Sequence, residues 1–300
     1  MPLPLDTLPD YPFTPQRFAR GAGIAMSYLD EGPRDGEVVL MLHGNPSWSF
    51  YWRHLVLGLR DRYRCIVPDH VGMGLSDKPD DKHYRYTLQS RIEDVERLLE
   101  HLGITGPITL AVHDWGGMIG FGWALKRRGR VKRLIVTNTA AFPLPKEKPL
   151  PWQLQLGRNY NIGALLIRGF NAFAAGTIDQ CASTKVSPEV RAAYFAPYDS
   201  WKNRISTLRF VQDIPLSPRD KAWAFVDEAG RTLHEYADRP AFIGWGLQDF
   251  VFDHHFLKGF TDALPKAEVM AFDDAHHYVL EDKHAVLVPA IRRFLDANPL

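Results

Sequence analysis

A short segment of the sequence places an acidic side chain where an enzyme's nucleophile could stand. Residues 112–117, Val-His-Asp-Trp-Gly-Gly, follow an apolar run and precede a segment with helical spacing. Strand, sharp turn and helix form the setting of a nucleophile elbow, which exposes its apex side chain at the strand end. Here the apex is Asp114, and Gly116 and Gly117 let the turn fold tightly. The alternative is that Asp114 only caps the following helix.

A second segment supplies hydrogen-bond donors for the same chemistry. His43-Gly44-Asn45-Pro46 follows the apolar run 37–42. If both segments end at one edge of a sheet, the backbone N–H groups of Asn45 and Trp115 can converge and stabilise a negatively charged oxygen. A plain turn between strand and helix is the alternative, because Gly-Asn-Pro also suits a turn.

A base for the nucleophile is available late in the chain. His276 and His277 follow the apolar run 268–272. In enzymes whose triad runs nucleophile, acid, histidine along the chain, the base stands at this position. The residue types alone do not show which of the two histidines is the base.

An acid that could orient this histidine follows the apolar run 241–245. Asp249 lies in the next loop, where a carboxylate can fix the imidazole and stabilise its charged form. Asp253 is a rival for this role. The other position for such an acid, after the run 131–137, holds Asn138, which cannot carry the charge. Asp249 is therefore favoured.

Alternating strands and helices are expected to bring these loops together. Short apolar runs predict strands at residues 24–30, 37–42, 63–68, 108–112, 131–137, 241–245 and 268–272. Helical spacing predicts helices at residues 50–59, 86–102, 116–126, 254–264 and 285–298. Repeated β-α units with short connections predict an α/β fold with a mostly parallel sheet flanked by helices.

The pattern changes between residues 141 and 218, where prolines and aromatic residues are frequent and no buried strand is evident. Helices are expected there at residues 154–160, 163–175, 188–194 and 202–211. We interpret residues 141–218 as a helical cap inserted into a core domain, whose two parts are residues 1–140 and 219–300.

Composition limits the class of protein. A net charge of +1 and 45% hydrophobic residues among 300 are ordinary for a globular chain and suggest no nucleic-acid surface. Cys65 and Cys181 form no metal-spaced pair and are too few for a disulfide framework, which fits a reducing compartment. The N-terminus does not resemble a signal peptide, and residues 162–178 are too short and polar for a membrane span. We expect a cytoplasmic enzyme without metal or organic cofactor.

Four motifs together resemble the haloalkane dehalogenase branch of the α/β-hydrolases, and the likeness covers nearly the whole chain and is weakest in the cap. The motifs are His43-Gly44-Asn45-Pro46-Ser47-Trp48, residues 69–79, His113-Asp114-Trp115-Gly116-Gly117, and His277-Tyr278-Val279-Leu280-Glu281-Asp282. The resemblance implies an α/β-hydrolase fold with Asp114 as nucleophile, His277 as base and Asp249 as acid. It also implies that Asn45 and the Trp115 indole N–H hold the leaving anion.

Within this branch, the Asn45–Trp115 pair with its acid at Asp249 resembles the third dehalogenase subgroup. Residues 45–53 and 68–79 are similar to the OleB family of β-lactone decarboxylases in bacterial olefin biosynthesis. This resemblance implies conversion of long-chain cis-β-lactones to cis-alkenes and CO₂, in association with other enzymes of that pathway. The alternative is a dehalogenase that hydrolyses haloalkanes to alcohol and halide through an alkyl-enzyme ester.

Either substrate is hydrophobic, and the cap offers apolar side chains that could cover Asp114. The residues expected to line the substrate site are Phe142, Trp152, Leu166, Phe170 and Phe173. Packing of the cap on the core is the alternative explanation for the same side chains.

Three other classes fit less well. An epoxide hydrolase shares the Asp nucleophile but needs two cap tyrosines, for which Tyr160, Tyr194 and Tyr198 are available. A serine esterase requires serine at the apex of the elbow. A non-catalytic ligand binder typically lacks part of the triad, whereas this chain carries every part.

Overall fold

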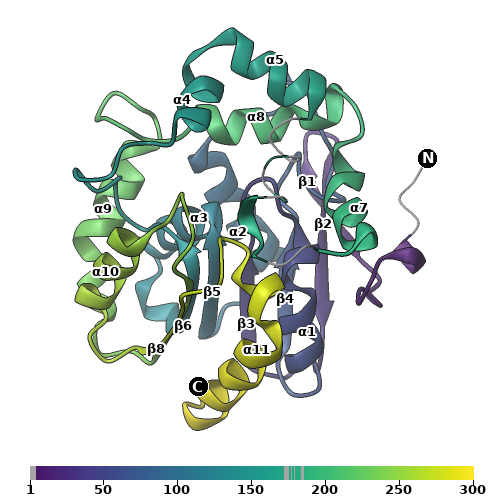
Figure 1. Ribbon diagram of the computed structural model, residues 1–300. Helices are drawn as coiled ribbons and strands as arrows, with labels where there is room; N and C mark the ends of the chain where they lie inside the picture. The colour runs from purple at the N-terminus through teal and green to yellow at the C-terminus, as the bar shows by residue number, and fades with distance from the viewer. Residues whose placement is uncertain (1–4, 172–175, 177, 179, 184–185) are drawn as a thin grey trace.

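A mostly parallel sheet, with eight strands in the described residues, crosses the centre of the protein (Figure 1). The structure is a computed structural model that describes residues 5–171, 176, 178, 180–183 and 186–300. The strand order is β1-β2-β4-β3-β5-β6-β7-β8; β2 is antiparallel to both neighbours, and the remaining pairs are parallel. The strands are β1 (Gln16–Gly21), β2 (Ile24–Glu31), β3 (Val38–Leu42), β4 (Arg64–Pro68), β5 (Ile108–Asp114), β6 (Val131–Thr139), β7 (Ala241–Gly246) and β8 (Glu268–Phe272).

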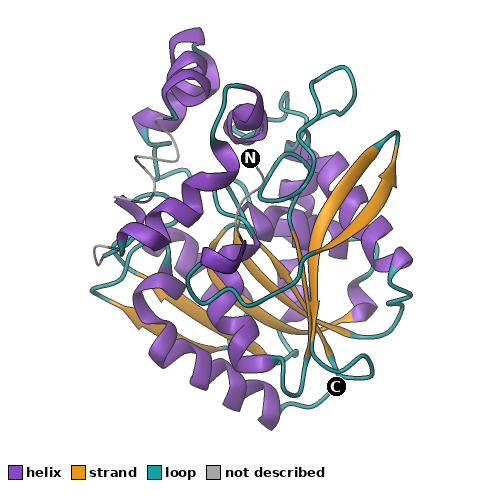
Figure 2. Ribbon diagram, turned by 90° about the vertical axis from the view of Figure 1, so that its right-hand side faces the viewer, coloured by secondary structure: helices purple, strands orange, loops and turns teal. Residues whose placement is uncertain are grey.

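Helices cover both faces of this sheet (Figure 2). Val39 and Met41 of β3 pack on the face covered by α1 and α11, whereas Leu40 and Leu42 pack on the face covered by α2, α3, α9 and α10. Both faces are buried, which explains why the central strands are continuous apolar runs. These helices are α1 (Arg53–Leu59), α2 (Leu88–His101), α3 (Trp115–Ala124), α9 (Trp223–Thr232), α10 (His254–Ala263) and α11 (Val279–Ala297).

A further group of helices lies between β6 and α9 in the chain. In Figure 1, α4, α5 and α8 gather at one end of the sheet, and Leu154, Ile167, Leu208 and Val211 join them in a small apolar cluster. The group comprises α4 (Trp152–Asn159), α5 (Asn161–Phe170), α7 (Pro188–Phe195) and α8 (Ile205–Gln212). The 3-10 helices are η1 (Leu5–Thr7), η2 (Ser49–Trp52), η3 (Arg128–Arg130), η4 (Ala196–Tyr198), η5 (Lys202–Arg204) and η6 (Leu233–Tyr236). Within the described residues, no helix is long and apolar enough to cross a membrane.

The α/β fold predicted from the sequence is confirmed, and each predicted strand lies within two residues of an observed one. Of the strands and α-helices given above for the described residues, two were not predicted. β1 is an edge strand with only Phe18 buried, so it shows no apolar alternation. α9 buries only Val226 and Ala229, too few to mark a helical face in the sequence.

Two predicted helix boundaries differ from the structure by more than three residues. The closing helix begins at Val279 instead of residue 285, because a kink at Lys283 separates an additional first turn. The helix predicted over 163–175 ends at Phe170, where Asn171 takes a left-handed conformation; residues 172–175 lie outside the described chain.

Candidate active site

The turn between β5 and α3 places Asp114 in a conformation that side chains rarely adopt, with φ 51° and ψ −127°. Two glycines make this turn possible. A Cβ atom on Gly44 would lie 1.8 Å from Asp114 Oδ1, and one on Gly116 would lie 1.9 Å from the Leu42 carbonyl oxygen. The Thr139 hydroxyl donates a hydrogen bond to the Asp114 carbonyl oxygen and so fixes the turn from β6. The segment has the geometry of a nucleophile elbow.

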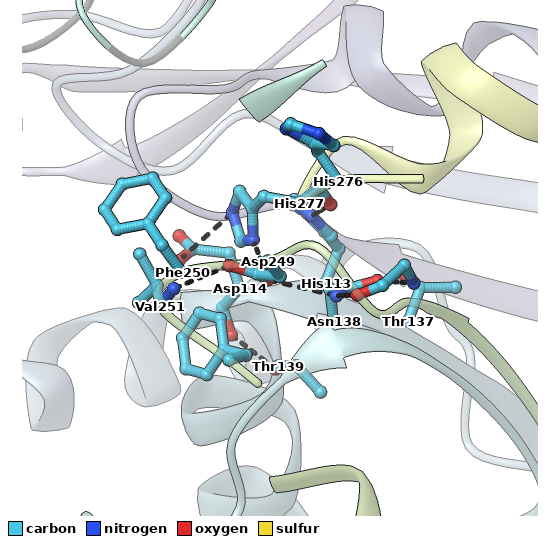
Figure 3. A network of polar contacts seen from close by, with 12 residues as sticks. His113, Asp114, Thr137, Asn138, Thr139, Asp249, Phe250, Val251, His276 and His277 are labelled. Atoms are coloured by element: carbon cyan, nitrogen blue, oxygen red, sulfur yellow. Dashed lines mark hydrogen bonds and ion pairs between the residues drawn. The ribbon is translucent and has the colours of Figure 1, made fainter. Parts of the chain in front are cut away.

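Loops after β7 and β8 bring two further side chains to Asp114 (Figure 3). The Nδ1 atom of His277 lies 2.7 Å from Asp249 Oδ2, and its Nε2 atom lies 3.7 Å from Asp114 Oδ2. His276 points away from both carboxylates, and its Nδ1 lies 3.0 Å from the Gln180 carbonyl oxygen. The geometry therefore selects His277, which the residue types alone did not.

Asp253, the rival acid, is engaged elsewhere. Its carboxylate pairs with Lys148 at 2.9 Å and accepts the His255 backbone N–H at the start of α10. Asp253, His254 and His255 also bring possible metal-ligating atoms within 4.8 Å of one another. Asp253 is already occupied by Lys148 and the helix cap, so we assign no function to this group.

Burial and charge give the two carboxylates different proton affinities. Burial raises the pKa of Asp114 to about 6, despite the opposing effects of His277 and of backbone N–H groups from Asn45 and Trp115. Burial acts on Asp249 in the same direction, but the charge and hydrogen bond of His277 hold the pKa of Asp249 below its usual value. For His277, burial lowers the pKa, yet Asp249 raises it further, so the net shift is upward. Asp249 thus stays ionised, whereas Asp114 titrates near neutrality.

Two groups expected to hold an anion adjoin Asp114. The Asn45 backbone N–H donates to Asp114 Oδ1, so this donor meets the candidate nucleophile itself. The Asn45 side chain donates to the Thr207 carbonyl oxygen at 3.1 Å. The Trp115 ring lies against Phe210, with ring centroids 5.2 Å apart. Among the hydrogen bonds of the described residues, none uses the Trp115 indole N–H, which leaves it available to a ligand.

A cavity of about 110 Å³, here called the inner cavity, lies over Asp114. Its polar lining side chains are Asn45, Asp114, Trp115 and His277. Its remaining wall is apolar and includes Met118, Phe142, Leu144, Leu154, Val226 and Phe252. A buried carboxylate at the base of an apolar cavity suits a nucleophile that attacks a hydrophobic substrate.

The expected substrate-lining residues are only partly placed in this cavity. Phe142 lines it, but Trp152 and Leu166 line a separate cavity farther out, and Phe170 is 72% exposed and lines neither. The expectation that these three side chains cover Asp114 therefore does not hold for the inner cavity, and their part in substrate binding stays a prediction. Phe173 lies outside the described residues.

Sequence reasoning missed two residues that hold the loop containing Asp249 in place. The Asn138 amide donates to Asp249 Oδ2 at 3.0 Å, and it exchanges two hydrogen bonds with the Gly246 backbone. Lys148 donates to the Phe250 carbonyl oxygen at 3.0 Å. The sequence drew attention to Asn138 at the end of β6 only because this position holds no acidic residue. No pattern in the sequence marks Lys148.

Residues considered for other roles lie away from the nucleophile. His113 stacks on Tyr51 and meets the His277 carbonyl oxygen at 3.0 Å, so it packs behind the elbow. The Tyr194 hydroxyl donates to Glu281, and the Tyr198 hydroxyl donates to the Ser47 carbonyl oxygen. Tyr160 is 62% exposed. None of these three tyrosines lines the inner cavity as the described residues define it, which argues against an epoxide hydrolase.

Comparison with known proteins agrees with this geometry. Residues 37–284 match a family model described as the alpha/beta hydrolase fold. The chain is 68% identical over 299 residues to the cis-3-alkyl-4-alkyloxetan-2-one decarboxylase of Xanthomonas campestris pv. campestris, covering 98% of this chain and 100% of that protein. It is 31% identical over 296 residues to a haloalkane dehalogenase of Mycolicibacterium paratuberculosis, covering 95% of this chain and 94% of that protein.

A solved structure supports the fold alone. The crystal structure of an ancestral haloalkane dehalogenase superposes with a TM-score of 0.85 at 24% identity, covering 94% of this chain and 98% of that one.

Proposed function

The chain belongs to the α/β-hydrolase family, in the branch that holds these decarboxylases and dehalogenases, and we propose that it converts cis-β-lactones with two long alkyl chains to cis-alkenes and CO₂. The observation that carries the proposal is Asp114, buried at the base of an apolar cavity in a chain 68% identical to a cis-3-alkyl-4-alkyloxetan-2-one decarboxylase. The similarity to a haloalkane dehalogenase is much lower, at 31% identity.

In the proposed reaction, Asp114 is the nucleophile. An oxetan-2-one is a four-membered ring ester, with the ring oxygen bonded to ring carbon C4 and the carbonyl carbon bonded to C3. The Asp114 carboxylate attacks C4, the C4–oxygen bond breaks, and the ring opens to a free carboxylate with C4 joined to Asp114 as an ester. The C3–carboxylate bond then breaks, its electrons form the C3–C4 double bond, and CO₂ and the Asp114 carboxylate leave. Atoms and charge balance without water or a proton donor.

The geometry of this route accounts for a cis product. Attack from the side opposite the ring oxygen places the new C4–oxygen bond anti to the C3–carboxylate bond. The two leaving groups are then aligned for elimination without rotation about C3–C4. Both alkyl chains remain on one side, so a cis-lactone gives a cis-alkene.

The other site residues stabilise negative charge in the proposed reaction, either on the opened substrate or on Asp114. The Trp115 indole N–H and Asn45 would hold the carboxylate released when the ring opens. His277, kept oriented by Asp249, lowers the proton affinity of Asp114 and so keeps the nucleophile ionised. No proton transfer by His277 is required.

The test uses two substrates with one enzyme. Purified protein is incubated separately with a cis-3,4-dialkyl β-lactone and a 1-bromoalkane, and alkene and bromide are measured. We expect cis-alkene from the wild type and none from Asp114→Ala. Bromide without alkene would instead identify a haloalkane dehalogenase. Neither product, or full activity in Asp114→Ala, would overturn both assignments.

Haloalkane dehalogenation is the second candidate because the residues that it needs are also in place. The 3.7 Å between His277 Nε2 and Asp114 Oδ2 leaves His277 near enough to activate water against an alkyl ester of Asp114. In that reaction Asn45 and Trp115 would hold halide.

Three wider features remain part of the proposal. Residues 141–218 would act as a cap over the inner cavity, to which they contribute Phe142, Leu154 and Val211. The buried, unpaired Cys65 and Cys181 favour a reducing compartment such as the cytoplasm. Exposed apolar side chains at Trp152 and elsewhere on α4 and α5 support a contact with other olefin-biosynthesis enzymes. Co-purification from a strain that expresses the pathway, compared with Trp152→Ser, tests that contact.

A further inference from the structure

A second apolar cavity, here called the outer cavity, lies between α4 and α5. Its volume of about 220 Å³ is twice that of the inner cavity by the same measure. Its wall includes Trp152, Leu156, Gly157, Leu166 and Ile167. None of its described lining residues carries a charge, so the outer cavity suits hydrocarbon better than a polar ligand.

The two cavities share part of their walls. Leu154 from α4 and Phe250 from the loop after β7 line both. Phe250 directly follows Asp249, and Lys148 holds its carbonyl oxygen at 3.0 Å. The wall that the two cavities share, here called the partition, thus includes two apolar side chains, and one of them directly follows Asp249.

The proposed substrate has a shape that matches two cavities. Its ring carries alkyl groups on neighbouring carbons and on the same side, so two hydrocarbon chains leave the reacting centre close together. With the ring at Asp114, the smaller inner cavity must hold the ring itself and at least the first carbons of both chains. A long second chain therefore needs further apolar space, and the outer cavity, which adjoins the inner cavity, provides it.

Resting on the proposed function, we propose that one alkyl chain of the lactone passes between Leu154 and Phe250 and occupies the outer cavity, while the other remains in the inner cavity. The outer cavity then selects for chain length and does not take part in the chemistry. Bulk added to its wall should affect long-chain substrates and spare short ones, because a short chain ends before the partition.

Leu166→Trp tests the assignment, because Leu166 lines only the outer cavity and is 36% exposed, so a larger side chain can be tolerated. Leu156→Trp fills the same cavity from α4. The matched control is Ile162→Trp, on the same helix as Leu166 but 61% exposed and lining neither cavity. Each variant is assayed with cis-3,4-diethyl and cis-3,4-dinonyl β-lactones.

We expect both cavity-filling variants to lower kcat/KM for the dinonyl lactone by about tenfold or more, since excluding two methylenes from an apolar site has about this effect. The diethyl lactone should react at the wild-type rate, and Ile162→Trp should match the wild type on both. If the ratio of kcat/KM for the dinonyl lactone to kcat/KM for the diethyl lactone stayed at its wild-type value in both variants, the chain assignment would be overturned. Absence of alkene from the wild type with both lactones would instead overturn the proposed function.

Discussion

The Nε2 atom of His277 stands 3.7 Å from Oδ2 of Asp114, beyond hydrogen-bond distance but within the range of an ion pair. The opposite ring nitrogen is held by Asp249 at 2.7 Å. His277 is therefore oriented by one carboxylate and acts on the other mainly through its charge. This arrangement serves a reaction in which Asp114 must be ionised, with or without activated water.

The first prediction concerns pH. Burial raises the pKa of Asp114 to about 6, so the carboxylate takes up a proton as the pH falls through that value and stops acting as a nucleophile. We expect kcat/KM for β-lactone decarboxylation to be flat above the pKa and to fall about tenfold per pH unit well below it. A pH profile of alkene formation measures this. A flat profile down to pH 4 would show that Asp114 ionisation does not limit the reaction.

The second prediction separates the two roles of His277. In His277→Gln, Asp114 loses a charge that lowers its pKa, so the acid limb of decarboxylation should move to higher pH. Alkene formation should persist above that limb, because no step needs a base. Under the second candidate function, the 1-bromoalkane should leave an alkyl ester on Asp114 of this variant that mass spectrometry of the intact protein detects. Loss of alkene at every pH in a folded variant would assign His277 an essential proton transfer.

The third prediction concerns the close approach of Gly44 to the nucleophile. A Cβ atom there would meet Asp114 Oδ1 at 1.8 Å, so Gly44→Ala must displace the carboxylate. We expect a fall in kcat of about a hundredfold or more, the usual effect of misplacing a reacting group by 1 Å. Gly129→Ala is the control, since its Cβ would meet nothing within 4 Å. Equal activities of the two variants would contradict the position given to Asp114.

The fourth prediction concerns Asn138. Its amide bonds to Gly246 in both directions and also reaches Asp249, all within a buried region. Asn138→Ala removes these partners from the Gly246 N–H and carbonyl oxygen and takes one hydrogen bond from Asp249, so it should lower the free energy of unfolding by about 2–3 kcal/mol. Urea denaturation measures the change, with Asn159→Ala at the exposed end of α4 as the control. A loss below about 0.5 kcal/mol, the range of neutral surface changes, would contradict the structural role of Asn138.

The sequence predicted the core of the site because each side chain follows a strand at one edge of the sheet. Asp114 is the last residue of β5, Asp249 follows β7 and His277 follows β8, so the order of the apolar runs was enough to group them. Parallel strands end at the same edge of the sheet, so the grouping does not depend on the exact bounds of each strand or loop. Their catalytic roles remain predictions that the experiments above test.

Side-chain direction was not predictable in the same way. His276 and His277 are neighbours in one loop, and only tertiary contacts, with Gln180 for one and Asp249 for the other, decide which faces Asp114. Trp152 and Leu166 were expected over the nucleophile because they are apolar. Apolar character does not say which cavity a helix faces, and here α4 and α5 turn these side chains toward the outer cavity.

The most direct test follows the oxygen atoms of Asp114 during turnover. Wild-type protein in excess over a cis-3,4-dialkyl β-lactone is allowed to react in water enriched in heavy oxygen. Alkene is then quantified, and the peptide that contains Asp114 is analysed by mass spectrometry. We predict cis-alkene with an unlabelled Asp114, because the carboxylate leaves intact when CO₂ is lost. Heavy oxygen in Asp114, which only hydrolysis of its ester can introduce, would contradict the account and identify a hydrolase.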